Sequence, residues 1–271
     1  HGQNLSQAEV DLYHLVSAFG SPSADPIMDS SMGLVVFDRY LRTGELTGLT
    51  EKQATVWAMV KGKRKDTLQL RFAEAGDPSP SKITRAYQAE NLATFDRLTQ
   101  KFEGTRQERV EQAVKWLQEE HPTAEIEAMT GKKLAASEYV SRKDGGYGIF
   151  GITGTKLGSY FLNRTGNLST STKDLWYART QARYFGLPLG SWKTNEETGK
   201  KELAPLTSPW SDKTKDGIRY RTLSDQAWQQ VANENGMELA EVQQALWDFE
   251  KRLWEHLGHP AQDRVFVSQG M

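Results

Sequence analysis

Apolar residues recur at helical spacing along most of the chain, and no segment shows the sustained alternation of a half-buried strand. One helix start is marked by a capping box, in which Thr105 is followed three residues later by Glu108. A short apolar run from Leu34 to Phe37 is the one stretch that we expect to be extended. The pattern predicts a mainly α-helical protein, with helices within 8–19, 51–60, 83–102, 105–121, 175–185, 224–235 and 242–257.

Two stretches have the composition of loops. Ala75 to Ser81 is rich in Pro and Ser and is predicted to be a linker. Gly190 to Gly217 contains Pro, Thr, Lys and Gly with little periodicity, and it is longer than most connections between elements. Two interpretations of this second stretch stay open: a loop that contacts a partner through Trp192 and Trp210, or a disordered segment.

The composition excludes several kinds of chemistry. The chain has 271 residues and no cysteine, so it has no disulfide, no thiolate zinc site, no cysteine-held iron–sulfur cluster and no cysteine nucleophile. No run approaches the roughly 18 apolar residues of a membrane span, and the first residues lack a secretory pattern. We therefore expect a soluble, cytoplasmic protein without a membrane partner.

The charge is unevenly distributed, although the net charge is only −1. Residues 131–220 contain 15 Lys and Arg against 8 Asp and Glu, a net of +7, and the remainder carries a net of −8. A basic region of this kind is either an ordinary solvated surface or an attraction for a polyanion such as DNA. Its local motifs decide between the two.

The informative motif runs from Gly148 to Thr180. Gly148, Gly151 and Gly154 form a glycine-rich turn that leads directly into an apolar helix, whose Leu157, Tyr160 and Phe161 can face a core. Asp174 stands where the N-cap of the following helix belongs. Because two helices that fold back on each other can bring their starts together, we expect Lys156 to lie near Asp174.

Such a pair has chemical meaning. Backbone N–H groups of a glycine-rich turn that opens a helix form an anion site, and a nucleic-acid phosphate is a natural occupant in basic surroundings. A deprotonated Lys156 can act as a nucleophile. A carboxylate at a helix N-terminus stays ionised, and Asp174 can then stabilise the developing cation of glycosidic cleavage.

This segment resembles the helix-hairpin-helix, Gly/Pro-Asp signature of the DNA glycosylase superfamily that contains endonuclease III and 8-oxoguanine DNA glycosylase. Gly154-Thr155-Lys156 matches the end of the family's hairpin, Asp174 follows Lys156 by eighteen residues, and Arg179 matches the last Arg of the motif. Trp176 replaces the usual His of the motif. The pattern is also similar to that of phage-encoded proteins with a Gly-x-Lys helix and a C-terminal helix like 245–251.

The resemblance implies a two-lobed helical glycosylase fold. Residues 1–44 would form an N-terminal helical segment that packs with the C-terminal lobe, 45–165 a helical lobe that ends in the hairpin, and 166–271 the catalytic-Asp helix, the basic loop and the C-terminal helices. It implies Lys156 and Asp174 as catalytic residues. The DNA contacts would come from Gly151, Thr153, Gly154, Thr155, Arg179, Lys143 and Trp176.

The expected function is therefore that of a DNA glycosylase, with possible lyase activity, which removes a damaged or modified base from double-stranded DNA after flipping it out. Its role would be base-excision repair or attack on modified phage or foreign DNA. No cofactor and no metal are expected. Two alternatives stay open: a non-catalytic helix-hairpin-helix module that binds DNA, and a helical protein whose basic segment binds an acidic protein partner.

Overall fold

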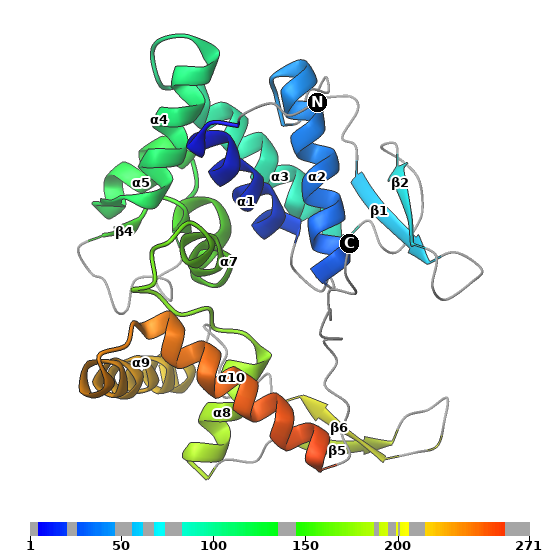
Figure 1. The fold of residues 1–271 in the computed structure, drawn as a ribbon, viewed down its shortest axis with the longest axis vertical. Helices are drawn as coiled ribbons and strands as arrows, with labels where there is room; N and C mark the ends of the chain where they lie inside the picture. Colours follow the sequence, from blue (N-terminus) through cyan, green and yellow to red (C-terminus); the bar gives the residue numbers. More distant parts are fainter. Residues whose placement is uncertain are drawn as a thin grey trace. The chain divides into compact units, whose positions relative to one another are not determined.

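The computed structural model describes residues 5–20, 26–46, 56–61, 68–73, 83–134, 145–186, 190–194, 199, 201–205 and 215–257. The protein is mainly α-helical, as the apolar pattern predicts (Figure 1). The chain divides into two compact units. Unit 1 contains the described residues up to 134 together with 145–165, and unit 2 contains those from 166 to 257.

Unit 1 is built from six helices and two short strand pairs among its described residues. Its helices are α1 (Gln7–Gly20), α2 (Pro26–Thr43), α3 (Ile83–Thr99), α4 (Arg106–Gln118), α5 (Thr123–Thr130) and α7 (Phe150–Arg164). The strand β1 (Val56–Lys61) pairs with β2 (Leu68–Ala73) in antiparallel register, with Val56 opposite Ala73. The strand β3 (Glu120–His121) pairs with β4 (Gly146–Tyr147).

The core of unit 1 forms where α1, α2, α3, α4, α5 and α7 meet. Phe19, Phe95 and Phe161 are almost completely shielded from solvent. The predicted core positions of α7 are confirmed, because Leu157 and Phe161 are buried and Tyr160 packs against the same cluster. Burial of such side chains contributes about 1.5–3 kcal/mol each, which makes this cluster the main source of stability for the unit.

Unit 2 contains α8 (Leu175–Tyr184), α9 (Lys215–Asn235), α10 (Leu239–His256) and the antiparallel pair β5 (Gly190–Thr194) and β6 (Lys201–Pro205). Its smaller core joins Tyr177 of α8 to Trp228 of α9 and Val242 of α10. The buried face of α10 is not the one that its apolar residues alone would mark, since Phe249 and Leu257 are exposed whereas Glu250 and Trp254 are buried. The contacts of α10 with α8 and α9 determine which face is covered.

Several sequence predictions are wrong. Leu34 to Phe37 lies inside α2, so it is helical rather than extended. The helix predicted over 51–60 is replaced in part by β1, whose hydrogen bonds come from β2. The loop predicted over 190–217 contains the β5–β6 pair. The linker predicted over 75–81 lies outside the described residues.

The N-terminal helices belong to unit 1. Helix α1 contacts α2, α3, α4 and α7 (Figure 1). The packing of residues 1–44 with the C-terminal lobe stays a prediction. The sequence boundary between residues 165 and 166 coincides with a boundary between the units. No described helix combines the length and the apolar character that crossing a bilayer requires.

Candidate functional site

The glycine-rich segment before α7 is held against the end of α4. The backbone N–H of Gly148 donates to the carbonyl of Glu119 at 3.0 Å, and that of Ile149 donates to the carbonyl of Leu117 at 3.0 Å. A Cβ atom at position 148 would lie 2.7 Å from the ring and the carbonyl oxygen of Trp116. Glycine is therefore required at this position by the close approach of the segment to α4.

Gly151 and Thr153 lie in the interior of unit 1. A Cβ atom at position 151 would lie 2.4 Å from Cγ2 of Ile126, so the first turn of α7 packs directly on α5. The Thr153 hydroxyl donates to the carbonyl of Ile149 at 3.1 Å. Both positions are buried, so contact with a DNA backbone at these two residues would need a local rearrangement. Their predicted role in DNA binding stays a prediction.

Gly154 interrupts α7 and starts a new helical segment. Its φ of 75° and ψ of 175° are far from helical values, and only glycine adopts them without strain. The turn that precedes Gly154 is capped from α3 and the end of α5, because Nζ of Lys132 donates to the carbonyl of Ile152 at 3.2 Å and to Oδ1 of Asn91 at 3.3 Å. The break in the helix thus has a defined position.

Thr155 and Lys156 are the first residues of the segment that follows this break. The first N–H groups of a helix have no partner inside it, so this start is an electropositive end. Lys156 is exposed, and within the part of the chain that the structure describes its ammonium group forms no hydrogen bond or ion pair. Its amine is therefore accessible for binding or reaction with an external group.

In unit 2, Asp174 is the N-cap of α8, as predicted. One carboxylate oxygen accepts a hydrogen bond from the backbone N–H of Tyr177 at 2.8 Å, and the residue has extended backbone angles. The partial positive charge of the helix start favours the ionised carboxylate. Asp174 is half-buried, so its carboxylate is fixed in direction and still reached by solvent.

Two polar residues of α9 and α10 hold the segment that contains Asp174. The neighbouring Lys173 forms an ion pair of 2.7 Å with Asp225, which also accepts a hydrogen bond of 3.1 Å from the hydroxyl of Tyr177. Gln243 accepts from the backbone N–H of Thr172 at 2.6 Å and donates to its carbonyl. The N-cap is thereby fixed from both sides.

Arg179 and Trp176 pack inside unit 2. The guanidinium group of Arg179 lies 4.5 Å from the ring centroid of Trp176 and 4.1 Å from that of Trp254. The three side chains are at most 8% exposed. This cation–π arrangement binds α8 to α10, and a direct contact of either residue with DNA would require it to open.

The predicted site residues are divided between the two units. Lys156 with Gly151, Thr153, Gly154 and Thr155 belongs to unit 1, whereas Asp174, Trp176 and Arg179 belong to unit 2. In unit 1 the group surrounds the helix break at Gly154, and in unit 2 it surrounds the N-cap at Asp174; the sequence indicates both features. The proximity of Lys156 to Asp174 stays a prediction, and Lys143 lies outside the described residues.

Sequence reasoning missed the residues that position Asp174. Asp225 and Gln243 are isolated polar residues on helices, and periodicity assigns such residues to a solvated face. A third residue that was missed, Glu250, could have been found from the sequence, because a charged residue at this position interrupts the apolar pattern of α10. Glu250 is fully buried and accepts hydrogen bonds from Nε of Arg183 and Nε1 of Trp254, both at 3.0 Å.

Comparisons with known proteins give no assignment: no protein-family model matches the chain, and no curated protein or solved structure matches it significantly. No group of three or more His, Cys, Asp or Glu side chains that could hold a metal ion is found among the described residues. We therefore infer the function from the chemistry of the segments around Gly154 and Asp174.

Proposed function

We propose that this protein is a DNA glycosylase with lyase activity, built on a helix-hairpin-helix glycosylase fold. The observation that carries the proposal is the exposed Lys156 amine at the helix start created by Gly154. A second helix start, capped by Asp174, follows eighteen residues later. An accessible amine and an oriented carboxylate are the two groups that this reaction requires.

In the proposed reaction, the neutral amine of Lys156 bonds to C1′ of a flipped nucleotide. The bond between C1′ and the base breaks, and the base leaves with the electron pair and takes up a proton. The sugar ring then opens as the C1′–O4′ bond breaks, which leaves an imine between C1′ and Nζ of Lys156. Loss of a C2′ proton and cleavage of the C3′–O bond complete the lyase step.

Asp174 has two tasks in this proposal. Its carboxylate stabilises the positive charge that develops on the sugar as the base departs, and it transfers a proton during ring opening. Lys173 is engaged by Asp225 at 2.7 Å, so its charge is balanced inside unit 2. Trp176 and Arg179 hold α8 on α10 and act as positioning residues for Asp174.

The biological roles proposed for this activity are base-excision repair and attack on modified phage or foreign DNA. The basic character of residues 131–220 supports a DNA substrate, because Lys and Arg supply most of the affinity for a phosphate backbone. The reaction uses side chains of the protein alone.

The test is borohydride trapping of the full chain on duplexes that carry an abasic site, an oxidised base or a modified cytosine. We expect a covalent adduct that is lost in Lys156→Gln and retained in Lys133→Gln, a matched control because Lys133 is an exposed lysine of the same unit. Asp174→Asn keeps a good N-cap and removes only the charge, so it should slow base release without unfolding α8.

Other results contradict the proposal in different ways. An adduct that persists in Lys156→Gln would assign the chemistry to another amine. No adduct and no base release, together with DNA binding that weakens with salt and is unchanged in Lys156→Gln, would leave a non-catalytic DNA-binding module. A failure to bind DNA at low salt would favour a helical protein-interaction protein.

A further inference from the structure

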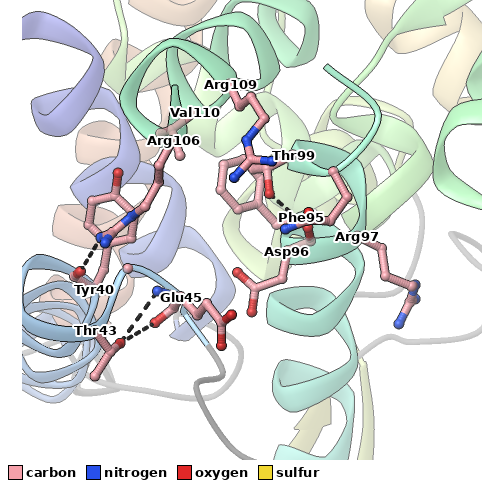
Figure 2. Close-up of a pocket in the computed structure, with 12 residues that line it drawn as sticks. Tyr40, Thr43, Glu45, Phe95, Asp96, Arg97, Thr99, Arg106, Arg109 and Val110 are labelled. Atoms are coloured by element: carbon pink, nitrogen blue, oxygen red, sulfur yellow. Dashed lines mark hydrogen bonds between the residues drawn. The ribbon is translucent and has the colours of Figure 1, made fainter. Parts of the chain in front are cut away.

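Unit 1 contains a cavity of about 280 Å³ that is separate from the glycine-rich segment. It lies where α2 and α3 end and α4 begins, and its walls combine apolar side chains with charges of both signs (Figure 2). Tyr40, Phe95 and Val110 line it as well, but each is at most 5% exposed. The volume is close to the lower limit of about 300 Å³ for small-molecule sites.

One wall carries an arginine whose hydrogen-bonding capacity is not used by the protein. Arg109 projects from α4 toward the last turn of α3 (Figure 2). Its Nε atom is buried and has no hydrogen-bond partner, and its guanidinium group forms no ion pair with any described residue. A buried donor of a charged group without a partner is unfavourable by about 1–3 kcal/mol or more. A carboxylate in the cavity would instead accept hydrogen bonds from the terminal nitrogens of this guanidinium group, which is only partly buried.

Arg106 lies one helical turn earlier on the same face of α4 and, unlike Arg109, has partners within the protein. It donates to the carbonyl of Tyr40 at 2.8 Å, and its guanidinium carbon lies 4.9 Å from the centroid of the Tyr40 ring. Arg106 therefore has a structural role at the end of α2. Arg109 lines the same cavity without any such partner, which leaves it available for a ligand.

The cavity also carries negative groups. Glu45 lines it with an exposed carboxylate that forms no hydrogen bond or ion pair with the described residues, and Asp96 lines it while accepting from the backbone N–H of Leu46 at 3.0 Å. Figure 2 shows both carboxylates in the space between the end of α2 and α3. Because α2 ends at Thr43 and α3 at Thr99, two helix C-termini add partial negative charge. This end of the cavity favours a cation.

We propose that the cavity binds a small zwitterion, an α-amino acid. Its carboxylate pairs with Arg109, and its ammonium group lies by Glu45 and Asp96. Inorganic phosphate has no positive group to place by Glu45 and Asp96, so we expect it to bind more weakly than a zwitterion. This site belongs to unit 1 alone and does not depend on the proposed glycosylase reaction.

The test is calorimetric titration of the full chain with L-leucine. Two matched compounds each lack one charge: 4-methylpentanoate has no ammonium group, and L-leucinamide has no carboxylate. We expect L-leucine to bind at least tenfold more tightly than either, since loss of one charged hydrogen bond corresponds to about a tenfold change or more. Arg109→Gln should lower the affinity for L-leucine at least tenfold, and Glu45→Gln should lower it several-fold.

Arg97→Gln is the control variant. The side chain of Arg97 is directed away from the other labelled residues (Figure 2) and donates to the hydroxyl of Thr94 at 2.9 Å, so its loss should leave the affinity for L-leucine unchanged. The proposal is overturned if L-leucine does not bind, or if its binding is equal in Arg109→Gln and the unmodified protein. Tighter binding of inorganic phosphate than of L-leucine would also overturn it. Circular dichroism of each variant shows whether unit 1 is folded.

Discussion

The side-chain amide of Gln243 on α10 engages both backbone groups of Thr172, two residues before the N-cap Asp174. It accepts from the N–H at 2.6 Å and donates to the carbonyl, as a neighbouring strand would. Gln243 is buried, so water does not replace these bonds readily when the amide is removed. This contact makes the orientation of Asp174 a property of the packing of α10.

Replacement of Gln243 by Ala should therefore destabilise unit 2. The Thr172 N–H loses the Gln243 acceptor, and the Thr172 carbonyl, which also accepts from the N–H of Asp174 at 3.0 Å, loses one of its donors. We expect a decrease of about 1 kcal/mol in the free energy of unfolding. The measurement is urea denaturation followed by circular dichroism. Gln244→Ala is the control, because Gln244 is exposed and bonds only to Asp248; an equal loss of stability in both variants would contradict the role of Gln243.

Asp174 should contribute to stability as a cap rather than as a charge. Asp174→Ala removes the hydrogen bond to the N–H of Tyr177 and should lower the free energy of unfolding by about 1 kcal/mol. Asn is an equally good N-cap, so Asp174→Asn should change stability by only a few tenths of a kcal/mol. The comparison uses the midpoints of urea unfolding, and an equal loss in the two variants would show that the charge is what stabilises α8.

Because Arg183 and Glu250 form an ion pair whose carboxylate is buried, substitutions at these two residues should have strongly non-additive effects on the free energy of unfolding. Glu250 is fully buried, and Nε of Arg183 lies 3.0 Å from its carboxylate. Arg183→Met leaves that carboxylate without its cation and should cost about 3 kcal/mol. The double variant Arg183→Met with Glu250→Gln should recover most of this loss, because a neutral amide still accepts from Trp254.

A double-mutant cycle of unfolding free energies measures this coupling. Strictly additive effects of the two substitutions would contradict a direct interaction between Arg183 and Glu250.

His14 should make stability depend on pH. Burial and the charge of Arg164, whose Nε donates to Nδ1 of His14 at 3.1 Å, lower the pKa of this imidazole below its ordinary value of 6.5. The unfolded chain then binds more protons than the folded chain, so the contribution of neutral His14 is present above pH 6.5 and decreases as the pH falls below it. Urea unfolding between pH 5 and 8 measures this dependence.

His14→Gln is the comparison for that titration, since Gln keeps a hydrogen-bond acceptor and does not titrate. As the pH falls below 6.5, the unmodified protein should lose more unfolding free energy than this variant does. A constant difference across this range would contradict the lowered pKa.

Gly151 should tolerate no side chain. In Gly151→Ala the added Cβ would meet Cγ2 of Ile126 at 2.4 Å and Cγ2 of Thr130 at 2.8 Å, which overpacks the contact between α7 and α5. We expect a loss of about 1–3 kcal/mol in unfolding free energy. DNA affinity of the folded protein, measured below the unfolding transition, should be unchanged; a specific loss of affinity without loss of stability would instead assign Gly151 to DNA binding.

Local features of the structure were predictable from the sequence because they depend on neighbours in the chain. The capping box of Thr105 and Glu108 and the N-cap at Asp174 are bonds between residues three positions apart. The helical spacing of Leu157 and Phe161 correctly predicted which face of α7 is buried. The helix over 51–60 failed because β1 is stabilised by hydrogen bonds to β2, a segment whose pairing is invisible in local periodicity.

By itself, the sequence determined the mainly helical class, the approximate bounds of α1, α3, α4, α8 and α10, the absence of cysteine chemistry, and Gly154 and Asp174 as the starts of helical segments. It did not indicate α2 or α5, and it placed the start of α9 nine residues too late. Only the tertiary structure decided that Gly151 and Trp176 are buried, that Gln243 and Asp225 hold the segment around Asp174, and that Arg109 faces a cavity without a partner. Burial and polar pairing depend on segments that are distant in the chain, and one-dimensional spacing contains no information about which of them meet.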